Sequence, residues 1–442
     1  MSIRLSDHFN YRRLLRFCLS TIIMMVFTSI YGVVDGLFIS NYAGTVPFAA
    51  INLVMPFIMI LGGFGFMLGT GGSALVAITL GEGEHDRANR YFSMIIGFTV
   101  VSGMVLSLLG VLFMRPIAVL LGATDAMLEH CVIYGRTVLA FNTAFMLQNT
   151  FQTFLATAEK PKLGLLCTVA AGVTNILLDT LFVAVFPLGV FGAALATGIS
   201  QCVGGLIPFL YFLRPNKSLL RLTKFRFEGK TILRATGNGS SELMSSISGS
   251  VVSMLYNFQL LKFAGENGVA VYGVLMYVQF IFVAVFIGYT IGTAPIIGYH
   301  YGADNSTEVR GILKKSLFLM LLGGLLMMLL AFLLGTPIAE IFVGYNKPLL
   351  KMTVAAFHIF SFSFILTGVN IFMSSFFTAL GNGAVSAAIS FLRTLVFQSF
   401  SVMVLPLLFG LNGIWYALSV AEVLGAVISM IFLIANHKKY NL

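Results

Sequence analysis

Twelve long apolar runs constrain the fold of this chain more than any other feature of its sequence. An apolar run of about 20 residues spans a bilayer as a helix, whereas membrane strands are shorter and alternate in polarity. With 58% hydrophobic residues, 10% charged residues and a mean hydropathy of +0.96, the chain carries more apolar surface than a soluble core could bury. We therefore predict an all-α integral membrane protein whose twelve transmembrane helices lie at residues 14–41, 47–79, 91–114, 131–157, 163–186, 189–213, 232–262, 268–298, 312–335, 352–378, 384–409 and 411–435.

The chain is also a tandem duplication, because it aligns with itself after a shift of 221 residues, half its length. Gly71 then falls on Gly292, and residues 189–192 fall on residues 410–413. Each copy holds six predicted helices, so both copies enter the membrane in the same orientation. We predict two six-helix lobes related by a pseudo-twofold axis along the membrane normal. The predicted division is an N-lobe at 1–213, a cytoplasmic linker at 214–231 and a C-lobe at 232–442.

Prolines and glycines indicate how these helices bend and pack. Pro56, Pro208, Pro295 and Pro406 fall inside predicted helices, and we expect each to bend its helix. Many glycines follow one another at short spacings, as in residues 62–72, which lets helix backbones approach closely in lipid.

Basic residues gather in the loops of one membrane side. Short loops rich in Lys and Arg stay in the cytoplasm, so we expect both termini on the cytoplasmic side of the plasma (inner) membrane. Topology and contact with anionic membrane lipid then explain the net charge of +10, and no nucleic-acid partner is expected. We predict no cleavable signal peptide, and the four cysteines form no CxxC pair that would indicate a disulfide framework or a metal site.

Two aspartates lie inside predicted helices of the first copy and have no counterpart in the second. Under the shift, Asp35 falls on Tyr256 and Asp179 falls among residues 400–402. An ionised carboxylate inside a bilayer costs several kcal/mol unless it is paired, hydrated or protonated. The asymmetry between the copies favours a site that exchanges a proton or a small cation. The structural alternative is an ion pair with a basic residue of another helix, Arg136 or Arg393.

Further oxygen ligands accompany the two acids. Asn175 and Asp179 are four residues apart, so they share one face of a helix, and Thr197 offers a hydroxyl from the next helix. Together with Asp35 they form a set of hard oxygen ligands that could hold Na⁺, or share a proton between the two acids. Spacing alone does not bring these three helices together.

Three motifs give the chain its resemblance to a known family: the helix segment 31–40 around Asp35, the turn at 156–161, and the Asn175, Asp179 and Thr197 set. On these the chain resembles the multidrug and toxic compound extrusion (MATE) family, in its DinF-like branch. The resemblance implies a secondary active antiporter that exports small organic, often cationic and lipophilic, compounds in exchange for H⁺ or Na⁺ by alternating access. It also implies that the four oxygen-bearing residues form the coupling site, and that Tyr31, Asn149 and Gln152 line the N-lobe chamber.

The sequence departs from the family pattern in two places. Residues 14–41 contain no proline, which argues against a mechanism in which protonation bends the first helix. Glu242 lies near the cytoplasmic end of the helix at 232–262, where it could bind protons, counter the charge of a substrate, or serve the helix terminus. His358 is either a titrating group or a neutral hydrogen-bonded one. Glu422 replaces Gln201 of the first copy, and its partner is open.

Three functions stay open on sequence grounds. The first is the antiporter; the second is a flippase for a lipid-linked oligosaccharide or peptidoglycan precursor; the third is a non-coupled membrane channel or receptor. A flippase cavity should be strongly basic, whereas the predicted interior holds acids beside few basic residues. The chain contains no GxxxxGK[ST], HExxH or GxSxG motif, so we predict that it is not an enzyme and that it needs no cofactor besides its coupling ion. We expect a monomer.

Overall fold

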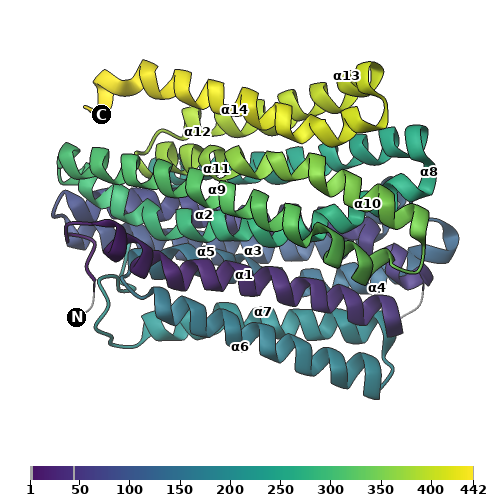
Figure 1. The fold of residues 1–442 in the computed structure, drawn as a ribbon. Coiled ribbons are helices and arrows are strands. Elements are labelled where there is room, and N and C mark those ends of the chain that lie inside the picture. The colour runs from purple at the N-terminus through teal and green to yellow at the C-terminus, as the bar shows by residue number, and fades with distance from the viewer. Residues whose placement is uncertain (1–2, 43–44, 442) are drawn as a thin grey trace.

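The computed structural model describes residues 3–42 and 45–441, and within these residues the chain forms helices and no strand (Figure 1). The helices run roughly parallel to one long axis, and both ends of the chain lie at the same end of the bundle (Figure 1). The predicted all-α fold is confirmed. In chain order the elements are α1 (Tyr11–Tyr42), α2 (Thr45–Gly81), α3 (His85–Leu120), α4 (Asp125–Ala140), α5 (Asn142–Thr157), α6 (Pro161–Asp179), η1 (Thr180–Val185), α7 (Gly189–Leu213), α8 (Gly229–Gly302), α9 (Ser306–Val343), α10 (Lys347–Phe360), η2 (Ser361–Ser363), α11 (Phe364–Ala379), α12 (Gly383–Ser390), η3 (Phe391–Gln398), α13 (Ser399–Phe409) and α14 (Leu411–Tyr440).

The twelve predicted spans are all helical in the described part of the chain. Some breaks between helices, however, do not coincide with the ends of the predicted spans. The segment labelled α8 contains two helical spans, which a kink at Gly265 separates, because the backbone there is not helical (φ +61°, ψ −153°). The span predicted at 131–157 is interrupted at Phe141, which separates α4 from α5. The span predicted at 352–378 is its counterpart in the second copy. It is interrupted at the corresponding place by the 3₁₀ turn at residues 361–363.

Helices α3 and α9 extend beyond the apolar spans predicted at 91–114 and 312–335, and they continue through Pro116 and Pro337. A proline removes one backbone hydrogen bond, and membrane helices tolerate this loss where neighbouring groups or water satisfy the freed carbonyl.

The duplication is visible in the backbone. Gly189 and Gly410, which the shift superposes, both have a positive φ, 58° and 57°, at the start of the last helix of each half. Only glycine adopts this conformation without strain, so both halves begin that helix with the same turn.

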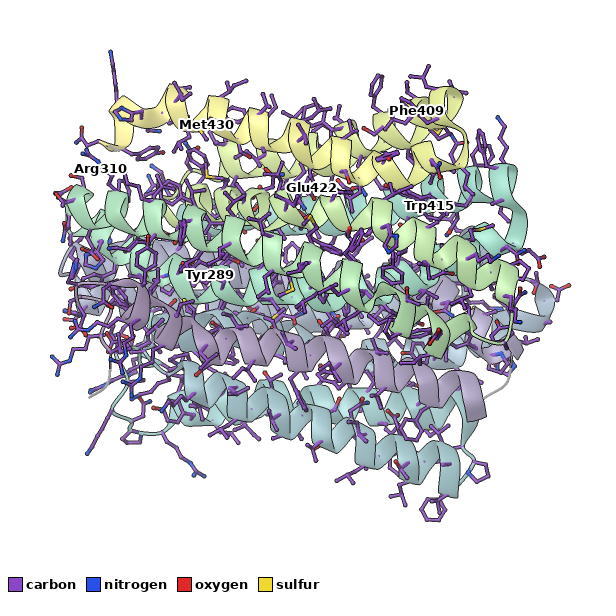
Figure 2. The ribbon with its side chains drawn as sticks, viewed as in Figure 1. Tyr289, Arg310, Phe409, Trp415, Glu422 and Met430 are labelled. Atoms are coloured by element: carbon purple, nitrogen blue, oxygen red, sulfur yellow. The ribbon has the colours of Figure 1, made fainter. Side chains whose placement is uncertain are left out.

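Side chains on the outer surface suit a lipid environment. Phe409 and Met430 point away from the bundle, while Glu422 points into it (Figure 2). Large exposed apolar residues of this kind cover α3, α9 and α14, as expected for helices that face hydrocarbon.

The two halves of the chain pack closely at the end that carries both termini. A Cβ added to Gly81 of α2 would lie 2.0 Å from the carbonyl oxygen of Tyr299 in α8. A Cβ added to Gly302 of α8 would lie 2.0 Å from the carbonyl oxygen of Ile78 in α2. The two contacts are related by the repeat, and both require glycine because the backbones nearly touch.

Candidate coupling site

Asp35 and Asp179 meet inside the first half of the chain. Asp35 lies in α1 and is 7% exposed, and Asp179 is the last residue of α6 and is fully buried. The two side chains are within hydrogen-bonding reach of one another. The π-helical turn η1 begins directly after Asp179, a local irregularity of the kind that frequently marks functional sites in helices.

Several oxygens in this region have no hydrogen-bond donor among the described residues. They are Oδ1 of Asp35, both carboxylate oxygens of Asp179 and Oδ1 of Asn175. Ionised carboxylates only accept hydrogen bonds, so two of them in contact require a shared proton or a bridging cation. The donor set is oxygen alone, which fits H⁺ or Na⁺, and the described residues contain no group of three His, Cys, Asp or Glu that would indicate a heavier metal.

Thr197 and Tyr134 extend the set of oxygens. The Thr197 hydroxyl in α7 donates to the carbonyl oxygen of Ala193 at 3.0 Å, which leaves its lone pairs available. Tyr134 of α4 lies close to Thr197 and to both aspartates, and its buried hydroxyl forms no hydrogen bond with the described residues. Sequence reasoning missed Tyr134, because nothing in its spacing links it to the aspartates.

The alternative in which a basic residue pairs with these acids is wrong. Arg136 is exposed and donates from Nε to the carbonyl oxygen of Val111 at 3.1 Å. Arg393 forms its ion pair in the second half of the chain, with Glu422. No ion pair of the described side chains involves Asp35 or Asp179.

The predicted lining residues of the first half lie near the acids to different degrees. Tyr31 is close to Asp35 and within hydrogen-bonding reach of Gln148, a second residue that the sequence reasoning did not select. Asn149 donates from Nδ2 to the carbonyl oxygen of Gly62 at 3.0 Å, so one of its groups already joins α5 to α2. Gln152 is buried on α5.

Glu242 lies apart from the acid pair. It lines a separate cavity between the two halves of the chain, where the neighbouring polar groups are hydroxyls of Thr70, Ser73, Thr153 and Thr290. This cavity combines a single carboxylate with apolar walls and hydroxyl groups.

The sequence model of the MatE family matches residues 20–181 and 241–403, most of the chain, once in each half. The chain belongs to the MatE family. The family resemblance inferred from the motifs is thus confirmed, while the DinF-like branch stays a prediction.

Relatives of this MatE protein match it along nearly its whole length. Multidrug export protein MepA of Staphylococcus saprophyticus is 25% identical and covers 95% of this chain and 93% of that protein. MepA of Staphylococcus aureus (strain MRSA252) is 23% identical, with the same coverage. Among solved structures, a multidrug resistance MATE family transporter in an outward-facing conformation has a TM-score of 0.93 at 21% identity, covering 99% of this chain and 98% of that one. MATE in complex with MaL6 has a TM-score of 0.93 at 20% identity, with the same coverage. At these identities the structures show a shared fold.

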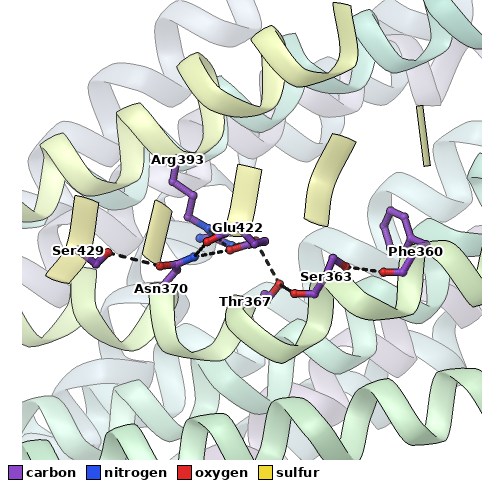
Figure 3. Close-up of polar contacts among 7 residues, drawn as sticks. All are labelled: Phe360, Ser363, Thr367, Asn370, Arg393, Glu422 and Ser429. Atoms are coloured by element: carbon purple, nitrogen blue, oxygen red, sulfur yellow. Dashed lines mark hydrogen bonds and ion pairs between the residues drawn. The ribbon is translucent and has the colours of Figure 1, made fainter. Parts of the chain in front are cut away.

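The second lobe of this MatE protein holds a charge-compensated network in place of an acid pair (Figure 3). The Glu422 carboxylate, on α14, accepts from Arg393 Nε at 2.9 Å and from an Arg393 Nη at 2.6 Å. It also accepts from Asn370 Nδ2 at 2.6 Å and from the Thr367 hydroxyl at 3.1 Å. Glu422 is 2% exposed, so its charge is neutralised inside the protein. Its partner, left open by the sequence, is therefore Arg393.

His358, the other candidate of the second lobe, stacks on the ring of Phe332 with centroids 4.3 Å apart. This stacking contact indicates that the His358 side chain packs α10 against α9.

Proposed function

We propose that this MatE protein is a secondary active antiporter that exports organic compounds in exchange for H⁺ or Na⁺. The observation that carries the proposal is the contact between Asp35 and Asp179, whose oxygens lack donors and whose surroundings lack a paired base among the described residues. Such a pair must take up a proton or a cation to be stable, and must lose it to recharge. Asn175 and Thr197 complete the coupling site, and Tyr134 supports it.

The relatives favour drug-like cargo. The MepA proteins are named multidrug exporters, and we extend that role to this chain because they match it over 95% of its length. We propose small, lipophilic organic cations as substrates. Glu242, in its hydroxyl-lined cavity, supplies the counter-charge, and Tyr31, Asn149 and Gln152 line the path through the first lobe.

Transport then follows from competition between ion and cargo. In the outward-open state the ion binds at Asp35 and Asp179 and removes their negative charge, which weakens attraction for the cargo and promotes its release. In the cytoplasm-facing state the ion leaves, the acids recharge, and new cargo binds. Coupling requires that ion and cargo favour different states, because equal affinity for both would shift no population.

Two other functions receive less support. A flippase for lipid-linked oligosaccharide or peptidoglycan precursors needs free positive charge to receive a pyrophosphate, but Arg393 is neutralised by Glu422. A non-coupled channel or receptor would have no use for two buried carboxylates without a basic partner in the described part of the chain, so it does not explain Asp35 and Asp179.

The orientation and organisation are part of the proposal. We place the protein in the plasma membrane, as a monomer, with both termini in the cytoplasm, because Lys and Arg gather in the loops at that end. The proposed lobes are 1–213 and 232–442. Between them the stretch from Arg214 to Glu228 is not helical, and it packs on α3 through Arg221 N, which donates to Asn89 Oδ1 at 2.8 Å.

The test is uphill efflux of a fluorescent organic cation from proteoliposomes, with a proton gradient and a sodium gradient imposed separately. An antiporter accumulates the cation against its gradient under one of the two. Movement that only ever follows the concentration of the cation itself would contradict the proposal and support a channel.

A further inference from the structure

The eight residues before α1 form a strap across the end of the molecule that carries both termini. This strap, residues 3–10, is not helical, yet the side chains of Leu5 and Phe9 are fully buried. Both belong to a hydrophobic core formed mainly by α8, α9 and α11 of the second lobe. A polar N-terminal segment normally frays into solvent unless it is tied down, so these contacts call for an explanation.

The strap is bound to the second lobe by charged groups of α9. Glu308 accepts from the backbone N–H of Phe9 at 2.8 Å through Oε1, and its Oε2 lies 2.7 Å from Nδ1 of His8. Lys315 Nζ donates to the carbonyl oxygen of Phe9 at 2.7 Å. Hydrogen bonds to charged groups are the stronger kind, and Glu308 and Lys315 together satisfy both backbone groups of Phe9.

The strap is also bound to the first lobe. Its chain continues directly into α1, and the N–H of Leu5 donates to Oε1 of Glu159 at 2.7 Å, in the turn between α5 and α6. The ring of Phe9 meets that of Phe17 in α1 edge to face, with centroids 6.2 Å apart. One short segment therefore joins both lobes at an end where their backbones also pack closely.

We propose that the strap is a latch, which holds the lobes together at the cytoplasmic end and must leave α9 before that end can open. The inference rests on the proposed alternating access, in which the lobes part at this end. If they part, the strap cannot keep its contacts with both Glu159 and α9. The covalent link to α1 keeps it with the first lobe, so the Glu308 and Lys315 contacts are the ones that break.

The test compares Glu308→Gln with the matched variant Glu159→Gln, each in a chain whose four native cysteines are replaced. Ser73→Cys, in the cavity between the lobes, serves as the reporter. A membrane-impermeant maleimide is added from the cytoplasmic side of inverted vesicles, without any ion gradient. Glu308→Gln should speed labelling roughly tenfold, the ratio expected for the loss of one charge-assisted hydrogen bond, and Glu159→Gln should change it little.

Equal labelling rates in all three proteins, or a faster rate in Glu159→Gln alone, would overturn the latch. Lys315→Met provides a second route if Glu308→Gln folds poorly, and it should also speed labelling. Because no gradient is present, the result does not depend on the coupling site: failure of the Asp35 assignment would leave the labelling difference intact.

Discussion

Replacing Arg393 with methionine should destabilise the second lobe strongly. The guanidinium gives Glu422 two hydrogen bonds, at 2.9 and 2.6 Å, and the glutamate is 2% exposed. Removing one partner of a buried ion pair costs about 3–5 kcal/mol, because the other charge is left without compensation. Asn370 and Thr367 still donate to the carboxylate, so we expect a loss near the lower limit, about 3 kcal/mol.

The reverse change, Glu422→Gln, should cost less. The Arg393 side chain is 19% exposed, so a guanidinium without its partner can reach water, and the new amide oxygen can still accept one of its hydrogen bonds. We expect a loss of about 1–3 kcal/mol, the range for a buried polar group whose partner is changed. The double variant Arg393→Met/Glu422→Gln should cost less than the sum of the two single changes, since it leaves no buried charge.

The assay is equilibrium unfolding of the purified protein in mixed micelles, by titration with sodium dodecyl sulfate, for the wild type, both single variants and the double variant. A loss below about 1 kcal/mol for Arg393→Met, or losses that simply add in the double variant, would refute the reasoning. The network would then be a surface-like ion pair that contributes little.

Three further predictions concern packing, coupling and cargo. Gly239→Ala would place a Cβ 1.9 Å from the carbonyl oxygen of Met67, so we expect a loss of about 1–3 kcal/mol in the same unfolding assay. Its matched control, Gly237→Ala, meets nothing within 4 Å and should be neutral or slightly stabilising; equal losses in both would contradict the close helix contact. Tyr134→Phe should raise the ion concentration needed for half-maximal efflux by roughly tenfold while maximal efflux is retained, and an unchanged ion dependence would remove Tyr134 from the site. Glu242→Gln should raise the half-saturating concentration of a monocationic substrate by roughly tenfold in efflux assays without altering ion dependence; an unaltered value would place the counter-charge elsewhere.

The sequence predicts the architecture well because membrane constraints act locally. Apolar length predicts each span, and the internal repeat predicts the two lobes without any knowledge of contacts. Irregularities within a span are harder to predict from the sequence. Nothing in the sequence around Phe141 indicates that its span is interrupted there.

The candidate site was only partly predictable. The spacing of Asn175 and Asp179 fixes a shared helix face, but it cannot tell which other helices approach that face. Tyr134 and the Arg393–Glu422 pair depend on contacts between helices far apart in the sequence, so periodicity carries no information about them. The strap was missed for another reason: residues 3–10 are polar overall, and only the fold shows that Leu5 and Phe9 are buried.

The central claim is that Asp35 and Asp179 couple ion entry to export. The most direct measurement is uphill efflux from proteoliposomes under the driving gradient for the wild type, Asp35→Asn, Asp179→Asn and the control Asp125→Asn, an exposed acid in the first turn of α4. We expect both buried variants to insert and fold but to lose uphill efflux, while Asp125→Asn transports like the wild type. Full uphill efflux by either Asp35→Asn or Asp179→Asn would contradict the account.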